Sequence, residues 1–212
     1  NKDSDRIFIF GVTVQNHSGY EYKGADFVSD VHITNYDGDY PRAEQYLSLV
    51  KKSDEALEEL ISYFEKVDEK TMIVFFGDHQ PNVEIGFINK IAPYRNMIVN
   101  SFLTRYETPF VIWTNYEIES KNDLGIVSPN FLGLKTLEYA GVPLSRECKM
   151  LKDVEEIAPA MNTWGYFDRA ITWNERRNEE PYRQDVLNVY NYYTYFNLHS
   201  KLGEDGRYAR GG

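Results

Sequence analysis

Residues 71–81 have the sequence TMIVFFGDHQP, and this stretch indicates both the class of fold and the place of its chemistry. The residues before Gly77 are β-branched, aromatic or Met, which is typical of a buried strand in a parallel sheet. Gly77 lets the backbone turn, and an acid and an imidazole follow, Asp78 and His79. Ligands of open α/β sheets gather beyond the carboxyl ends of strands. Asp78 and His79 are therefore candidate ligands of one cation, with a solvated loop pair as the alternative, and Gln80 is a candidate pocket residue.

A second predicted strand also ends near a histidine. Residues 6–14, RIFIFGVTV, alternate and then run apolar, and the polar cluster QNHSG follows at residues 15–19. His17 is therefore a candidate catalytic or substrate-binding residue, with a surface or turn-capping histidine as the alternative. Asn16 either contacts the substrate or holds the turn through an Asx hydrogen bond. His32 lies among polar residues and is expected to be a loop histidine.

The predicted elements alternate as in an α/β domain. Residues 43–66 place apolar side chains at helical spacing, which predicts a long amphipathic helix with Pro41 near its start. Residues 109–114, PFVIWT, predict a further buried strand, and residues 130–140 predict a helix closed by Gly141. This alternation predicts a mostly parallel sheet with helices on both faces.

The character of the chain changes near residue 146, where apolar residues become sparser. We expect a connecting excursion and then a terminal helix within the aromatic-rich residues 182–196. Most of its tyrosines are expected to pack on the domain, with sugar stacking as the alternative role. Residues 203–212 predict a frayed tail.

The composition sets limits on the class of protein. The chain has 212 residues with 42% hydrophobic content, enough for one domain or a large part of a bigger one. Its formal net charge of -10 argues against a nucleic-acid partner, since phosphate binding requires clustered Lys and Arg. Neither a transmembrane span nor a signal peptide is visible in the sequence. The single cysteine, Cys148, has no histidine neighbour, so nucleophilic use is not expected.

The order of these motifs resembles a known family. It runs from VTVQNHSGY at residues 12–20, through a helix containing SLVKKSDEALEELISYFE, to MIVFFGDHQP at residues 72–81 and TPFVIWTNYE at residues 108–117. This order is similar to the carboxyl-terminal half of the catalytic domain in lipoteichoic acid synthase-like phosphoglycerol transferases, of the sulfatase and alkaline phosphatase superfamily. The resemblance covers roughly residues 7–141.

The resemblance implies a domain organisation. Residues 1–145 would form the carboxyl-terminal half of a sulfatase-like α/β catalytic domain. Residues 146–212 would form an extension whose aromatic-rich terminal helix packs on the same domain.

The resemblance also implies a chemistry. One divalent cation, Mn²⁺ first and Mg²⁺ or Zn²⁺ as alternatives, would be bound by Asp78 and His79 together with an acid and a threonine nucleophile from the amino-terminal half of the domain. His17 would contact the phosphate or the leaving group, and Asn16 and Gln80 complete the candidate substrate-binding set. A covalent phosphoglycerol-threonine would then be resolved by an acceptor alcohol.

One departure from the family pattern matters. In that family the acid and the nucleophile lie well upstream of the NH motif, whereas only sixteen residues precede His17 here. We therefore expect a carboxyl-terminal part of a larger protein, inactive alone, with its nucleophile outside this chain. The implied substrates are phospholipid head groups or cell-envelope glycans. The implied location is the outer face of a bacterial cytoplasmic membrane, reached through anchoring helices that precede Asn1.

Other classes of function remain open at this point. A sulfatase-superfamily hydrolase or a phosphoethanolamine transferase would share the same metal ligands. A different class is an acidic α/β module that binds a partner or a glycan without catalysis.

Overall fold

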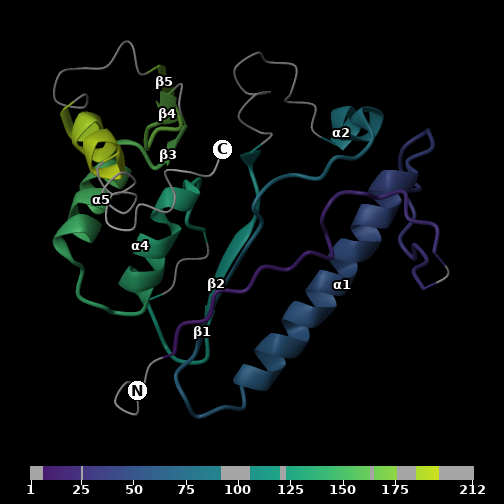
Figure 1. Cartoon of the computed structure of the whole chain (residues 1–212), viewed down its shortest axis with the longest axis horizontal. Coiled ribbons are helices and arrows are strands. Elements are labelled where there is room, and N and C mark those ends of the chain that lie inside the picture. Colours follow the sequence, from purple (N-terminus) through teal and green to yellow (C-terminus); the bar gives the residue numbers. More distant parts are fainter. Residues whose placement is uncertain are drawn as a thin grey trace, which may run out of the picture. The chain divides into compact units, whose positions relative to one another are not determined.

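The computed structural model describes residues 7–24, 26–91, 106–119, 123–162, 165–175 and 185–195. The chain divides into two compact units, Asn1–Tyr116 and Glu117–Gly212, whose elements are labelled in Figure 1. The predicted domain boundary after residue 145 follows the family resemblance and stays a prediction. The predicted tail at residues 203–212 lies outside the described residues.

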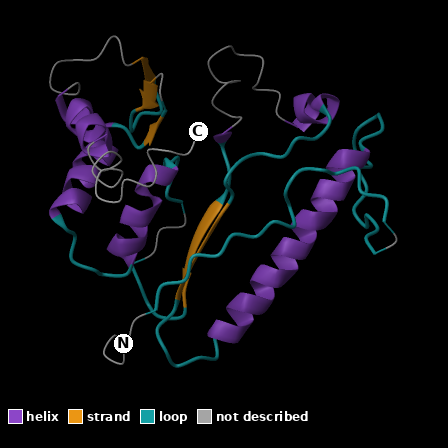
Figure 2. Cartoon of the chain, in the orientation of Figure 1, coloured by secondary structure: helices purple, strands orange, loops and turns teal. Residues whose placement is uncertain are grey.

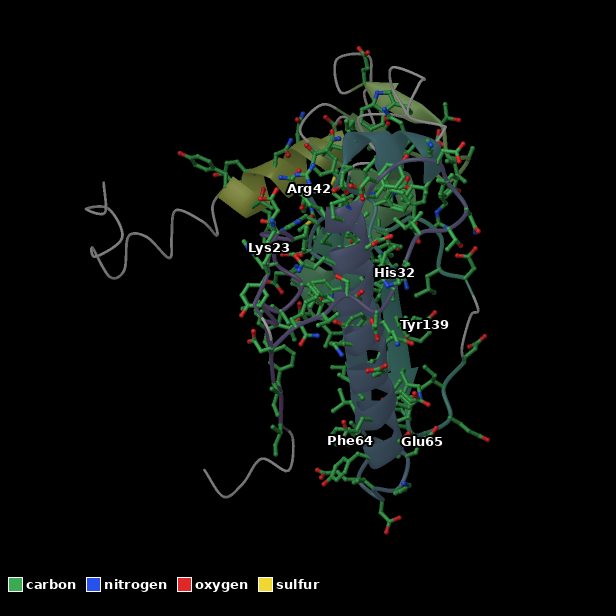
Figure 3. All side chains as sticks on the ribbon, turned by 90° about the vertical axis from the view of Figure 1, so that its right-hand side faces the viewer. Lys23, His32, Arg42, Phe64, Glu65 and Tyr139 are labelled. Atoms are coloured by element: carbon green, nitrogen blue, oxygen red, sulfur yellow. The ribbon has the colours of Figure 1, made fainter. Side chains whose placement is uncertain are left out.

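The first unit is dominated by α1, Pro41–Phe64, the long helix in Figure 2. The predicted amphipathic helix is thereby confirmed. Pro41 lies at its first turn, where a missing amide hydrogen leaves no helical hydrogen bond unmade. In Figure 3 the helix extends from Arg42 at one end to Phe64 and Glu65 at the other.

A small core packs against the first half of α1. Its buried side chains come from the segment before α1, from α1 itself and from residues 83–88. They are Tyr20, Tyr40, Ala43, Val83, Phe87 and Ile88. Phe87 and Ile88 belong to α2, Ile85–Ile91. The rings of Tyr40 and Phe87 lie 5.5 Å apart between centroids. This core holds the loop that carries His17 to the same body as α1.

Polar side chains of α1 hold the loop before it. The amide of Gln45 accepts from the backbone nitrogen of Tyr22 at 3.1 Å and donates to its carbonyl oxygen at 2.9 Å. The hydroxyl of Ser48 accepts from the backbone nitrogens of Asp30 and Val31, each at 3.1 Å. The described residues of this loop form neither helix nor strand, so these bonds satisfy backbone groups that a sheet would otherwise satisfy.

The strand before Gly77 is present, but its pairing differs from the prediction. β1, Met72–Phe76, pairs antiparallel with β2, Phe110–Thr114, where we predicted a parallel sheet. Asn115 fixes this pairing at one end, because its backbone nitrogen and side-chain oxygen bind the carbonyl and amide of Thr71 at 3.2 and 2.8 Å. The last two residues of β1 are exposed, so β1 is less buried than its apolar pattern predicted. A buried parallel strand needs neighbours on both edges, and among the described residues β1 is paired on one edge, with β2.

The strand predicted at residues 6–14 is not formed in the described part of this segment, residues 7–14. Its apolar side chains are between 67% and 86% exposed, namely Ile7, Phe8, Ile9, Phe10, Val12 and Val14. A strand requires a hydrogen-bonding neighbour, and no described segment pairs with residues 7–14. The apolar pattern identified a segment with a tendency toward strand, and the prediction that it forms one here is wrong.

The second unit contains two helices and a small sheet. The predicted helix at residues 130–140 is confirmed as α4, Pro129–Tyr139, and Gly141 follows it with φ of +66° as a closing residue. Where the sequence predicted only an excursion, the structure has a second helix, α5, Arg146–Ile157. An antiparallel sheet follows in the order β3-β4-β5, formed by Ala160–Met161, Gly165–Phe167 and Trp173–Glu175.

The core of the second unit includes the terminal helix. Its buried residues are Phe131, Val154, Ala158, Tyr166 and Leu187, and Leu187 lies in the helical residues 185–195. The described part of the predicted terminal helix therefore packs on α4, α5 and β4. Tyr190 takes part in this packing, and its hydroxyl accepts from Asn130 Nδ2 at 2.6 Å. Over the residues that the structure describes, we find no helix with the length and apolar character of a membrane span.

Glu84 caps the N-terminus of α1 from outside the helix. Its Oε1 accepts from the backbone nitrogen of Arg42 at 2.9 Å, and its Oε2 accepts from that of Ala43 at 3.0 Å. Burial raises the pKa of the Glu84 carboxyl, but the hydrogen bonds from Arg42, from its own backbone and from Ala43 outweigh burial, and the net pKa is lowered. The carboxylate also lies where the helix dipole favours negative charge.

We expect Glu84→Gln to lower the free energy of unfolding by about 1–2 kcal/mol at neutral pH. Because the pKa in the folded state is lowered from 4.5, the carboxylate contributes stability above that value and loses it as pH falls through the folded pKa. Urea unfolding should therefore show the difference from wild type shrinking below about pH 4. Glu58→Gln, an exposed control on the same helix, should change stability by less than about 0.5 kcal/mol. A difference that is the same in acid and at neutral pH would contradict this cap.

Candidate functional site

The GDH turn, residues 77–79, follows β1 and is tied to the start of β2. The backbone nitrogen of Gly77 donates to the carbonyl of Pro109 at 3.2 Å, and its carbonyl accepts from the hydroxyl of Thr108 at 2.8 Å. A Cβ at position 77 would lie 3.1 Å from the Cβ of Thr108, which is tighter than an ordinary contact. Glycine is therefore needed for this close approach, and the approach fixes where the next two side chains begin.

Asp78 and His79 present two metal-binding atoms close together. Asp78 Oδ2 lies 3.7 Å from His79 Nε2, while Asp78 Oδ1 accepts from the backbone nitrogen of His79 at 2.9 Å. His79 Nδ1 lies 3.0 Å from the carbonyl oxygen of Gln80. A carbonyl oxygen only accepts, so this bond places a proton on Nδ1, and in the neutral imidazole Nε2 then carries the lone pair. Metal-ligating histidines characteristically donate their other ring nitrogen to a carbonyl or carboxylate. The donor set thus fits a divalent cation that accepts oxygen and imidazole ligands.

Gln80 braces the same turn. Its Nε2 donates to the carbonyl of Glu107 at 3.0 Å, in the segment that leads to β2. Within the described ranges, no group of three His, Cys, Asp or Glu side chains is gathered so as to hold a metal ion. The roles of Asp78 and His79 as ligands, and of Gln80 as a pocket residue, stay predictions.

His17 lies in the NH turn, residues 15–18. Its backbone nitrogen donates to the carbonyl of Val14 at 3.0 Å, and its ring is exposed. His17 Nδ1 lies 3.3 Å from the carbonyl oxygen of Ser18, which by the same reasoning places the proton on Nδ1. Nε2 then carries a lone pair, so the ring can accept a proton, and once protonated it can bind a phosphate oxygen.

Asn16 is bound to α1 instead of to its own turn. Its Nδ2 donates to the hydroxyl of Ser53 at 2.9 Å, and the Nε2 of Gln15 donates to the same hydroxyl at 2.8 Å. An Asx hydrogen bond, one of two predicted roles for Asn16, would be accepted by Oδ1, and Oδ1 has no hydrogen-bond partner among the described residues, so this role is wrong. Asn16 Oδ1 is buried. A direct substrate contact by Asn16 stays a prediction.

The NH turn and the GDH turn belong to one region of the first unit. The hydroxyl of Tyr20 donates to the carbonyl oxygen of Asn16 at 2.7 Å. Burial raises the pKa of this hydroxyl, and the charges of Tyr46 and Asp78 raise it further. The carboxylate of Asp78 is thus near enough for its charge to act on the group that holds the NH turn. That His17 shares a site with Asp78 and His79 stays a prediction.

Two side chains of this region were not predicted from the sequence. Ser53 lies inside a helix, where a single serine gives no signal. Tyr20 directly follows NHSG, and a buried aromatic after a polar turn is the signal that could have identified it. His32 is confirmed as a loop histidine: it lies beside α1 in Figure 3 with its Nδ1 3.2 Å from Glu44 Oε2.

Comparison with known proteins gives three matches. A family model described as Sulfatase matches residues 1–142. A protein of Rhizobium meliloti (strain 1021), assigned to cyclic beta-1,2-glucan modification, is 33% identical over 147 residues, which make up 65% of this chain and 22% of that protein. The solved structure of Streptococcus pyogenes phosphoglycerol transferase GacH in complex with sn-glycerol-1-phosphate has a TM-score of 0.51 and 18% identity, and the match covers 69% of this chain and 32% of that chain. The chain therefore spans less than a third of the length of both proteins.

Proposed function

The chain belongs to the sulfatase family, and from that premise we propose that it is part of a metal-dependent phosphoglycerol transferase acting on cell-envelope glycans or lipid head groups. Family membership confirms the resemblance predicted from the NH and GDH motifs. The sulfatase and alkaline phosphatase-like α/β fold is likewise confirmed by the family match and by the likeness to GacH. The reaction and its substrates are the part that we propose.

The orientation of Asp78 and His79 is the observation that carries this proposal. Their Oδ2 and Nε2 atoms lie 3.7 Å apart, and in the neutral imidazole Nε2 carries the lone pair, because Nδ1 faces a carbonyl. This neutral tautomer is the one in which Nε2 can bind a metal ion. Both side chains are exposed, so a cation and a substrate have access to them.

We assign the remaining roles as follows. Mn²⁺ is the proposed cation, with Mg²⁺ or Zn²⁺ as alternatives, and when bound it supplies charge to a phosphoryl oxygen and lowers the pKa of a coordinated hydroxyl. His17 moves the proton of the attacking or leaving hydroxyl at its Nε2. Asn16 and Gln80 shape the turns on which His17 and the Asp78–His79 pair lie. A threonine in a part of the protein outside this chain is the proposed nucleophile.

The named relatives favour one pair of substrates. GacH was solved with sn-glycerol-1-phosphate, and the Rhizobium meliloti protein is assigned to modification of a cyclic glucan. Both findings fit a reaction in which a lipid head group donates phosphoglycerol and a glycan hydroxyl accepts it. Such substrates lie at the outer face of a bacterial cytoplasmic membrane, where we propose that the complete protein acts.

The test uses the complete protein with phosphatidylglycerol labelled in its head-group glycerol, Mn²⁺, and a soluble β-1,2-glucan. We expect label to move to the glucan with release of diacylglycerol, and a chelator to stop both. Release of free glycerol phosphate without labelled glucan would identify a hydrolase. Sulfate release from an aryl sulfate, without phosphoglycerol transfer, would overturn the proposal in favour of a sulfatase.

A further inference from the structure

His17 lies on a turn that directly follows residues 7–14. Residues 7–14 form no strand with any described segment, and their apolar side chains face solvent. The imidazole of His17 is also exposed, so its own packing does not fix the ring. A catalytic group must be held within a fraction of an ångström to be effective. Among the described residues, support for His17 therefore comes from other segments.

Tyr20 is the first source of support. Its side chain is 4% exposed in the core of the first unit, and its ring packs edge-on against Tyr46 with centroids 5.4 Å apart. Its hydroxyl donates to the carbonyl oxygen of Asn16 at 2.7 Å. That carbonyl belongs to the peptide group that joins Asn16 to His17. The core of the unit is thereby linked to the peptide plane directly before the histidine.

Ser53 is the second source of support. Its hydroxyl oxygen accepts from Gln15 Nε2 at 2.8 Å and from Asn16 Nδ2 at 2.9 Å, so two consecutive side chains of the NH turn bind one point on α1. A hydroxyl oxygen has two acceptor positions, and these two bonds use both. The amide nitrogen of Asn16 is thus committed to α1 and is not free for a substrate.

We propose that Tyr20 and Ser53 are positioning residues for His17, which together fix the NH turn to the core and to α1. The catalytic part of this proposal rests on the proposed function, because it assigns His17 to proton transfer. The structural part of the proposal does not depend on the proposed function, since it concerns only where the imidazole is held. Tyr20 and Ser53 do not touch the reacting atoms, and they act through the backbone and side chain of Asn16.

The structural part is tested in this chain by ¹⁵N NMR of the histidine rings. Tyr20→Phe keeps the ring and removes one hydroxyl, and Ser53→Ala removes the acceptor on α1. We expect both to shift or broaden the His17 signals while those of His32 stay unchanged. Tyr46→Phe, which removes a hydroxyl from the other ring of the same pair, is the matched control and should leave His17 unchanged. Unchanged His17 signals in Tyr20→Phe, or an equal shift in Tyr46→Phe, would overturn the inference.

The catalytic part is tested in the complete protein. Tyr20→Phe and Ser53→Ala should each lower kcat about tenfold while KM and the Kd for Mn²⁺ stay within about twofold, because a misplaced proton-transfer group affects the chemical step. Ser53→Thr keeps a hydroxyl at the same place and should restore kcat. An unaltered kcat alongside shifted His17 signals would overturn this part. Absence of transfer by the wild-type protein would instead refute the proposed function, and the NMR experiment would still decide whether the two residues hold His17.

Discussion

Asp78→Asn should reduce phosphoglycerol transfer by the complete protein about a thousandfold. The asparagine keeps the shape of the side chain and an oxygen able to accept from the backbone nitrogen of His79, a bond of 2.9 Å in the native turn. What it loses is the negative charge that attracts a cation. A metal ion supplies several kcal/mol of charge stabilisation in phosphoryl chemistry, and about 4 kcal/mol corresponds to a thousandfold change in rate. Steady-state turnover at fixed Mn²⁺ concentration measures this loss.

The matched control for this variant is Asp54→Asn. Asp54 is an exposed carboxylate on α1, so the same charge is removed without any effect on the GDH turn. Turnover in the control should stay within about twofold of wild type. Circular dichroism of both variants should be native, since Asp78 is exposed and contributes little to the core. A turnover for Asp78→Asn within tenfold of the wild-type value would remove Asp78 from the metal site.

His17→Gln should lower kcat by about 10²- to 10⁴-fold, the usual contribution of general acid–base catalysis. The Kd for Mn²⁺ should stay within about twofold, because His17 lies in a different turn from the proposed ligands. Glutamine retains a polar group at the site but cannot carry the proton. Stopped assays give kcat, and isothermal titration calorimetry with Mn²⁺ gives the Kd.

The control for this second variant is His32→Gln. His32 is an exposed loop histidine whose Nδ1 lies 3.2 Å from Glu44, so its replacement removes an imidazole from the same unit. Both kcat and Kd should be unchanged. If His17→Gln abolished Mn²⁺ binding, His17 would be a ligand, and the division of roles between the two turns would be wrong.

Each helix or strand that was predicted correctly has its sequence pattern within its own short segment. The helical spacing of residues 43–66 and the apolar runs at 72–76 and 110–114 are local patterns, and each gives an element. The direction in which β1 meets β2 is not local, because it depends on contacts such as Asn115 with Thr71. The segment 7–14 shows the same limit: its side chains favour a strand, but pairing is decided by other parts of the sheet.

The second unit was predicted less completely. α5 has apolar residues at helical spacing, Met150, Leu151, Val154 and Ile157, and Ser145 caps its N-terminus, so a signal for this helix was present in the sequence and was missed. The strands β3, β4 and β5 have two or three residues each, too few for an alternating pattern to be recognised.

The candidate site likewise has features that are visible in the local sequence and features that depend on distant contacts. The adjacency of Asp78 and His79 is visible in the sequence, but the tautomer set by the carbonyl of Gln80 is not. The bonds from Tyr20 and Ser53 to the NH turn join residues through single side chains, and such bonds leave no periodic pattern. The sequence therefore predicted the candidate site residues, and the structure shows how the turns that carry them are held.

Electron spin echo spectroscopy of Mn²⁺ bound to the complete protein tests the central claim most directly. A coordinated imidazole nitrogen gives a ¹⁴N modulation, so binding through His79 Nε2 predicts this modulation in the wild type and in His32→Gln, and its loss in His79→Gln. Binding of Mn²⁺ with the ¹⁴N modulation unchanged in His79→Gln would contradict the assignment of Asp78 and His79 as the ligands of the catalytic cation.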